Sequence, residues 1–305
     1  MGGRRGRLHW GTRVLPRALA VLALVTLSVG GLVLGSTVGA SPGQNLIDLN
    51  SGVTATQMAQ SLVGVGINVS NVAYTGDLHA AGEFSGLGAI GFESGITLSS
   101  GAVATSEGGD LFYTSNILGP NVGTGTTAAF GTLGDTDLDA IVTPDVTEDA
   151  SVLQFDFVPS GNQITFQYVF GSEEYNEFVN EFNDVFAFYV NGTNCATVGG
   201  HPVSVNTINL AVNPDLYRDN STTPGPATID TELDGLTTVL TCTAKVTPGA
   251  SNHVKLAIAD TRDDVLDSTV FLAGGSFRVN HAPTATADDY FATQDVPLNI
   301  PAPGC

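Results

Sequence analysis

LQFDFVPSGNQITFQYVF, residues 153–170, indicates the fold class of this chain. Large apolar residues occupy every second position from Leu153 to Phe157 and again from Ile164 to Phe170, with Gln, Asp and Thr between them. A period of two is typical of a β-strand that buries one face. The stretch therefore predicts two strands, each with one face in a core.

Further strand patterns lie on both sides of this stretch. Residues 185–190 are apolar at almost every position, which predicts a strand buried on both faces, and Asn191-Gly192 then favours a hairpin turn. At least eight short strands with turns between them predict an all-β, jelly-roll-like β-sandwich of two sheets. The other strands are expected around residues 96–98, 237–246, 253–259 and 269–272.

One short helix is expected near the N-terminus. Thr54 can cap it, Met58 and Leu62 share one face, and Gly64 and Gly66 end it. Residues 119–134, rich in Gly and Thr, are expected to form a long flexible loop.

Charge is distributed very unevenly along the 305 residues. The net charge is −20, but the first 40 residues hold five of the ten Lys and Arg residues and no acid, so the rest carries −25. This excludes a nucleic-acid binder, because phosphate backbones need clustered Lys and Arg. It also argues against docking on anionic lipid.

The first 40 residues are typical of a signal peptide. An Arg-rich start precedes an apolar run at 18–35, and Val38 and Ala40 fit a cleavage site. The alternative is an uncleaved membrane anchor. Both place the rest of the chain outside the cytoplasm, and after cleavage we expect no membrane insertion.

Export also bears on the cysteines. A disulfide between Cys195 and Cys242 is expected, with Cys305 left over, and the alternative is three free thiols.

A family resemblance rests on residues 166–192, FQYVFGSEEYNEFVNEFNDVFAFYVNG, which resemble the hallmark of the choice-of-anchor L domain of exported bacterial proteins. Three other segments resemble the family in the same order: GDTDLDAIV (134–142), DGLTTVLTCTAKVTPG (234–249) and KLAIADTRDDVLDSTVFL (255–272). The resemblance implies a secreted or surface module and carries over no catalytic or ligand residue.

The expected domain organisation follows from the first 40 residues and from this resemblance. A signal peptide at 1–40 is followed by the choice-of-anchor L-like domain at 41–281. Residues 282–305 resemble the start of a cadherin-like or Ig-like repeat, truncated after its first strands.

Acidic clusters are candidate calcium ligands. Asp135, Asp137 and Asp139 have the spacing that opens a calcium loop, but Ala140 and Val146 exclude an EF-hand. A divalent cation would relieve repulsion in so acidic a chain, so calcium is the expected cofactor. The alternative is that these acids are solvated and only start helices or shape turns. The other candidate ligands are Glu173, Glu174, Asp184, Asp260, Asp263 and Asp267.

The sequence thus predicts a secreted or cell-surface, non-enzymatic module of a multidomain adhesin or matrix protein, stabilised by calcium. Its expected partner is an extracellular protein or glycan, bound through loops. One alternative is a carbohydrate-binding module that uses Tyr113, Tyr175 or Tyr217. Another is a glycoside hydrolase with Glu174 and Asp184 as its acid and base.

Overall fold

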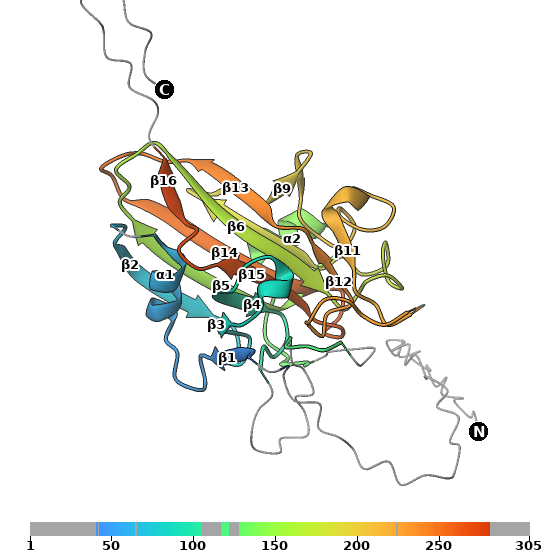
Figure 1. Ribbon diagram of the computed structural model, residues 1–305. Helices are drawn as coiled ribbons and strands as arrows, with labels where there is room; N and C mark the ends of the chain where they lie inside the picture. The colour runs from blue at the N-terminus through green and yellow to red at the C-terminus, as the bar shows by residue number, and fades with distance from the viewer. Residues whose placement is uncertain are drawn as a thin grey trace, which may run out of the picture. The chain divides into compact units, whose positions relative to one another are not determined.

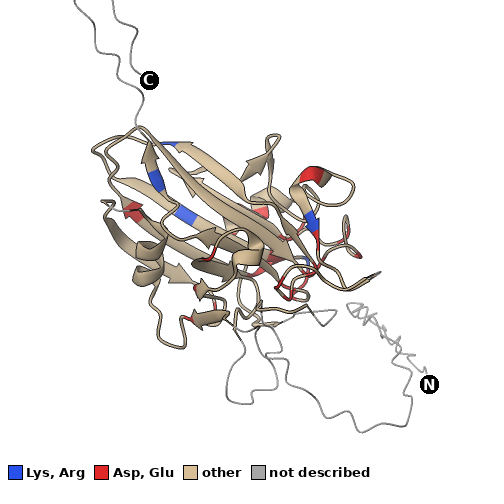
Figure 2. Cartoon of the chain, viewed as in Figure 1, with Lys and Arg blue, Asp and Glu red and all other residues tan. Residues whose placement is uncertain are grey.

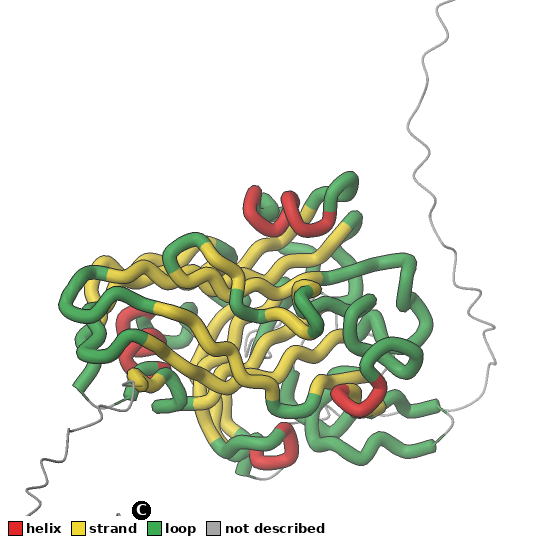
Figure 3. The backbone as a smooth tube through the Cα atoms, turned by 90° about the horizontal axis from the view of Figure 1, so that it is seen from above, coloured by secondary structure: helices red, strands yellow, loops and turns green. Residues whose placement is uncertain are grey.

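The computed structural model in Figure 1 describes residues 41, 43–64, 66–104, 117–121, 128–223 and 225–280. The predicted signal peptide and the predicted repeat lie outside these residues, as does Cys305. Two antiparallel sheets dominate the described residues, and Figure 3 shows their strands in two layers. The predicted all-β sandwich of two sheets is confirmed.

The larger sheet has nine strands within the described residues. Strands β15 and β16 pair along one edge of β6, and β12 and β13 pair along the other. In spatial order the path runs β1 (Asn45–Asp48), β3 (Ala81–Ser85), β4 (Ser94–Ser99), β15 (Ser268–Ala273), β6 (Gln163–Ser172), β12 (Gly235–Thr237) and β11 (Tyr217–Asp219), with β13 (Leu240–Lys245) and β16 (Arg278–Asn280) also on β6.

The smaller sheet has five strands in this part of the chain, and a separate strand pair and short helices complete the described elements. Its order is β2 (Val69–Thr75), β5 (Thr147–Phe157), β14 (Asn252–Thr261), β7 (Val185–Val190) and β8 (Thr193–Asn194). The remaining elements are β9 (Thr197–Val198), β10 (His201–Pro202), α1 (Ala55–Leu62), α2 (Thr136–Val142) and the 3₁₀ turns η1 (Gly88–Ile90) and η2 (Pro214–Leu216).

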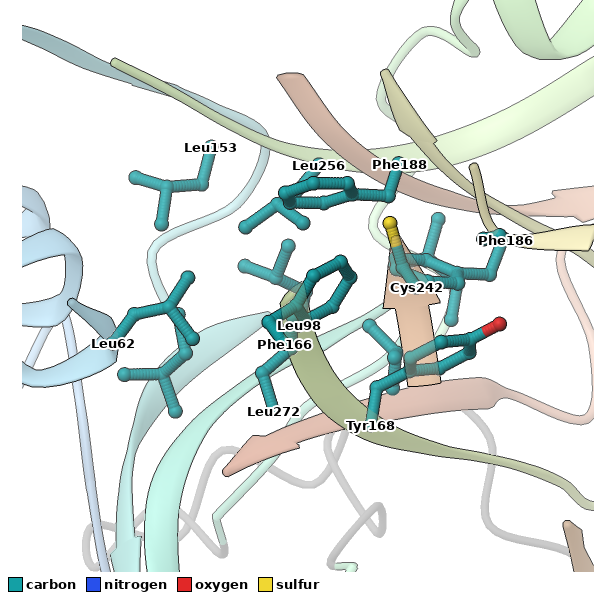
Figure 4. Packing of buried hydrophobic residues seen from close by; sticks show 14 of the residues in the cluster. Leu62, Leu98, Leu153, Phe166, Tyr168, Phe186, Phe188, Cys242, Leu256 and Leu272 are labelled. Carbon is teal, nitrogen blue, oxygen red and sulfur yellow. The ribbon is translucent and has the colours of Figure 1, made fainter. Parts of the chain in front are cut away.

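Aromatic residues from both sheets fill the space between the layers (Figure 4). The rings of Phe166 on β6 and Phe188 on β7 lie 4.0 Å apart between centroids, and those of Tyr168 and Phe186 lie 5.4 Å apart. Phe155 on β5 lies in the same buried cluster as Phe166 on β6, so the two predicted one-sided strands turn their apolar faces toward the same core. The predicted disulfide is confirmed between Cys195, just after β8, and Cys242 on β13, with Cα atoms 5.4 Å apart.

The predicted N-terminal helix is confirmed as α1. Thr54 and Gln57 form a capping box at its start, and Met58 and Leu62 are fully buried against the core. No helix among the described residues is long and apolar enough to cross a bilayer.

Two local expectations differ from the structure. The single strand expected at 237–246 is divided into β12 and β13. Between the pairs Leu236–Gly171 and Leu240–Tyr168, the segment that joins β12 to β13 contains one more residue than β6, and this extra residue interrupts the pairing. A second helix, α2, also forms at 136–142 and covers the outer face of the smaller sheet, where Leu138 and Val142 pack. Its seven residues are too few for a helical period to stand out in the sequence.

Candidate functional site

Strand ends from both sheets meet at one end of the sandwich. In the larger sheet, Ser268 at the start of β15 pairs with Ser172 at the end of β6, and Thr269 pairs with Ser99 at the end of β4. In the smaller sheet, β5 and β7 begin beside the end of β14. The Ser268 hydroxyl donates a 2.8 Å hydrogen bond to Asp184, just before β7, and so joins the two sheets.

Acidic side chains are buried at this end, and Figure 2 shows many Asp and Glu residues around it. An ionised carboxylate loses much hydration free energy when it is buried, so its charge must be balanced by donors, a proton or a cation. Among the described residues, the acids that are 3% exposed or less are Asp149, Glu173, Glu174, Asp184, Asp260 and Asp267, together with Asp48 elsewhere. Five of the nine predicted ligands are in this group.

Asp184 accepts hydrogen bonds from two donors outside the acidic group, and its carboxyl also shares a hydrogen bond with that of Asp260. The backbone N–H of Thr261 donates to Oδ1 at 2.9 Å, and the Ser268 hydroxyl donates to Oδ2. Burial raises the pKa of the Asp184 carboxyl, and these donors, which favour the ionised form, offset only part of the rise. Asp184 therefore connects β14 of one sheet with β15 of the other.

Asp260, near the end of β14, is fully buried, and no backbone N–H donates to its carboxyl oxygens. The carboxyls of Asp184 and Asp267 and the hydroxyl of Ser100 are among its neighbours. Burial, followed by the charges of Asp184 and Asp267, raises the pKa of Asp260 well above its ordinary value. A carboxyl placed in this way needs a proton or a cation.

Glu174 follows the end of β6 and is 1% exposed. Its backbone N–H donates to the Ser172 hydroxyl at 2.9 Å, whereas its side-chain Oε2 is buried without a hydrogen bond. Burial raises the pKa of Glu174 to about 9, and the charges of Asp184 and Asp263 add to the rise. Asp263 is half-buried, and burial raises its pKa as well.

Glu173 and Asp267 lie where β15 and β6 begin to pair. The Glu173 N–H donates to the Asp267 carbonyl at 3.1 Å, and Asp267 Oδ1 accepts the N–H of Ala128 at 3.2 Å. A Cβ atom at Gly101 would overlap the Asp267 carboxylate. The absence of a side chain at Gly101 therefore makes room for this acid.

Asp149 is a buried acid at this end that sequence reasoning missed. Its carboxylate accepts hydrogen bonds from the N–H groups of Phe130, Gly131 and Thr132 and from the Thr132 hydroxyl. It therefore holds the described end of the predicted 119–134 loop, of which residues 122–127 lie outside the described part. No spacing pattern distinguishes Asp149 from Glu148 beside it, so the sequence offers no signal for this role.

The predicted ligands Asp135, Asp137 and Asp139 do not join this group. The expectation that they lie in a loop is wrong, because Asp135 caps α2 by accepting from the N–H groups of Asp137 and Leu138. Lys255 Nζ lies 2.7 Å from Asp135 and 2.6 Å from Asp137.

Asp139 Oδ1 accepts both the N–H and the hydroxyl of Thr147 at 2.7 Å. A lysine and backbone donors thus already satisfy the carboxylates at this position. Calcium binding by these three residues stays a prediction.

Three basic side chains of the described residues bind groups other than the buried acids. Lys255 forms ion pairs with Asp135 and Asp137 at the start of α2. Arg262 forms one with Asp145, and Arg218 donates to the backbone carbonyls of Ala89 and Ile90. None of the described Lys or Arg ion pairs includes Asp184, Asp260 or Glu174. As the described side chains stand, no group of three or more His, Cys, Asp or Glu encloses a metal position.

Comparison with known proteins identifies the family. Residues 47–278 match the choice-of-anchor L domain, which is more than half of the chain, and the chain belongs to this family. The family is a surface-associated extracellular module that occurs in exported bacterial proteins. No curated protein matches the chain.

A solved structure described as the Agl-KA catalytic domain also matches, with a TM-score of 0.27 and 14% sequence identity. The match covers 85% of this chain and 31% of that one, so the chain spans about a third of the solved protein's length. At this TM-score the likeness carries no argument about fold or activity.

Proposed function

We propose that the chain is an extracellular, non-enzymatic module of a multidomain adhesin or matrix protein, stabilised by calcium and bound to an extracellular protein or glycan. Family membership supports the extracellular setting. The burial of Asp184, Asp260 and Glu174 without a described basic partner carries the calcium assignment. Calcium prefers oxygen ligands, and extracellular modules bind it at up to millimolar concentrations.

Thermal unfolding of the full chain tests this proposal. A cation that binds only the folded state raises the unfolding temperature, and we expect a rise of roughly 5 °C in millimolar calcium relative to excess chelator. Sodium chloride at equal ionic strength is the control for charge screening. Equal unfolding temperatures in calcium and in chelator would contradict calcium stabilisation.

A carbohydrate-binding module is less well supported. Tyr175 is fully buried and donates its hydroxyl to the Ile208 carbonyl at 2.7 Å, and its ring packs on Tyr217, which is 8% exposed. Neither ring therefore has a free face for a sugar, which corrects their assignment as stacking residues. Tyr113 lies outside the described residues. Calcium-dependent binding to a glycan array would favour this alternative.

A glycoside hydrolase needs two carboxyl groups that reach one sugar. Glu174 and Asp184 are each 1% exposed, and Asp184 is held by donors from β14 and β15. A substrate cannot reach two acids buried in this way. Hydrolysis of a polysaccharide by the wild-type chain, abolished by Glu174→Gln, would overturn the non-enzymatic assignment.

A further inference from the structure

We infer that the outer face of the larger sheet, around the start of β6, binds an acidic glycan, a polysaccharide whose sugar rings carry carboxylates. The inference rests on the proposed function, because it gives the extracellular glycan partner a place and a chemical class. Three strands form this face, with β13 and β16 pairing on the two edges of β6. Two rows of residues across these strands make up the basic patch: Lys245, Gln163 and Asn280, then Thr243, Thr165 and Arg278.

Strand register and burial show that the basic patch faces outward. Residues directly opposite each other on antiparallel strands have their side chains on the same face of the sheet. Phe166 on β6 and its partner Cys242 on β13 are buried in the core, so Thr165 and Thr243 beside them point to the other face. The exposed members of the patch are Thr243, Lys245, Arg278 and Asn280.

The charge of the basic patch is opposite to that of the domain as a whole. Only five Lys and Arg residues follow residue 40, and two of them, Lys245 and Arg278, lie here. Strands β6, β13 and β16 contain no Asp or Glu, and neither cation forms an ion pair with a described residue. Figure 2 shows a basic segment on β16, away from the red loops of the acidic end. The patch is therefore complementary to an anion.

The other side chains of the basic patch favour a sugar as the carrier of that anion. Thr hydroxyls and Gln and Asn amides both donate and accept hydrogen bonds, which suits sugar hydroxyls. The Arg278 guanidinium can bind a carboxylate through two parallel hydrogen bonds. Two cations are too few for a continuous phosphate backbone. A peptide that adds as a strand needs a free edge, and both edges of β6 are paired here.

An open groove of about 540 Å³ adjoins the basic patch, and its size is typical of small-molecule sites. Thr165 and Arg278 belong to both, and half-buried Phe92 gives the groove an apolar wall. Glu93 is the one acid among the described residues that line it. Because Glu93 repels an anion, we place the ligand's carboxylate over the two cations and a neutral part of a sugar ring toward Phe92.

Arg278→Gln gives the sharpest test, because it removes a charge from an exposed residue shared by the patch and the groove. The matched control is Arg262→Gln, which removes the same charge from an exposed residue after β14, at the acidic end. Lys245→Gln is a second variant. The probes are oligogalacturonate, its uncharged methyl ester and an oligoglutamate peptide. Calorimetry in calcium-free buffer would measure binding to each full-length protein, and the unfolding temperature would verify folding.

We expect wild type and Arg262→Gln to bind oligogalacturonate with equal affinity. Arg278→Gln should bind it about tenfold more weakly and Lys245→Gln several-fold more weakly, with unfolding temperatures close to that of wild type. The methyl ester should bind wild type about tenfold more weakly than oligogalacturonate does.

Full binding of oligogalacturonate by Arg278→Gln and Lys245→Gln would overturn the site. Tighter binding of oligoglutamate than of oligogalacturonate by wild type would overturn the glycan assignment in favour of an acidic peptide. If wild type bound no oligogalacturonate, the inference would be wrong. The unfolding temperature in calcium and in chelator would still test the proposed function separately, because the calcium assignment concerns the acidic end and not this face.

Discussion

Individual carboxylates have distinct roles at the acidic end of the sandwich, where Asp149, Asp184 and Asp260 are buried. Asp149 accepts hydrogen bonds from three successive backbone N–H groups, at Phe130, Gly131 and Thr132, and so holds the chain before α2 in place. Asp260 accepts none from the backbone. These two acids are equally buried but differ in what balances their charge, because hydrogen-bond donors surround Asp149 whereas other carboxyls lie around Asp260.

Asp149→Asn should lower the free energy of unfolding by about 2 kcal/mol, because the amide places an N–H₂ group where an oxygen accepts backbone N–H groups. Asn tolerates the positive φ of 49° at this position, so the backbone itself is not strained. Urea unfolding would measure the change. Asp215→Asn, which removes an exposed carboxyl on η2, is the control. Equal losses in the two variants would show that the hydrogen bonds to Asp149 do not hold the chain before α2.

At the scale of elements, strands and turns follow directly from the sequence pattern. Residues 153–157 and 164–170 alternate because each strand has one face against the core, and the structure places them in β5 and β6. Helix α2 and the break between β12 and β13 were not predicted, because each depends on partners distant in sequence. For α2 these partners are the outer face of the smaller sheet and Lys255, and for the break the partner is β6.

The candidate site was predictable in part for the same reason. The acids beside strand ends, such as Asp184 and Asp260, stand out in the sequence, and the topology brings those ends together. Sequence does not separate them from Asp135 and Asp137, which have the more regular spacing but face Lys255. The register with which β14 pairs with β5 decides their positions: it places the Asp260 side chain in the buried end of the sandwich and the Lys255 side chain beside α2.

The hairpin turn between β7 and β8 offers a matched test of backbone conformation. Gly192 has a φ of +78°, whereas Gly225 has none in the left-handed range, and a Cβ atom at either position would meet no atom within 4 Å. Gly192→Ala should lower the unfolding free energy by about 1 kcal/mol through strain alone. Gly225→Ala should leave it unchanged or slightly higher. Equal effects in thermal unfolding would contradict the role of the turn.

At the scale of the whole domain, two kinds of link join the sheets besides core packing. At the acidic end, Ser268 of the larger sheet bonds Asp184 beside the smaller one. Across the other part of the core, Cys195 beside β8 is bonded to Cys242 on β13. The first link depends on the ionic state of a buried group, and the second is covalent, so they should respond to different conditions.

Loss of the disulfide should lower the unfolding free energy without changing calcium binding. The bond closes a loop between residues 47 positions apart, which the chain-entropy model values at about 4 kcal/mol. The double variant Cys195→Ala with Cys242→Ala, and wild type under reductant, should both unfold at lower urea concentration. Reductant should not affect the double variant further. An unchanged urea midpoint would show that this link does not stabilise the sandwich, and a lost calcium response would show that the two links are coupled.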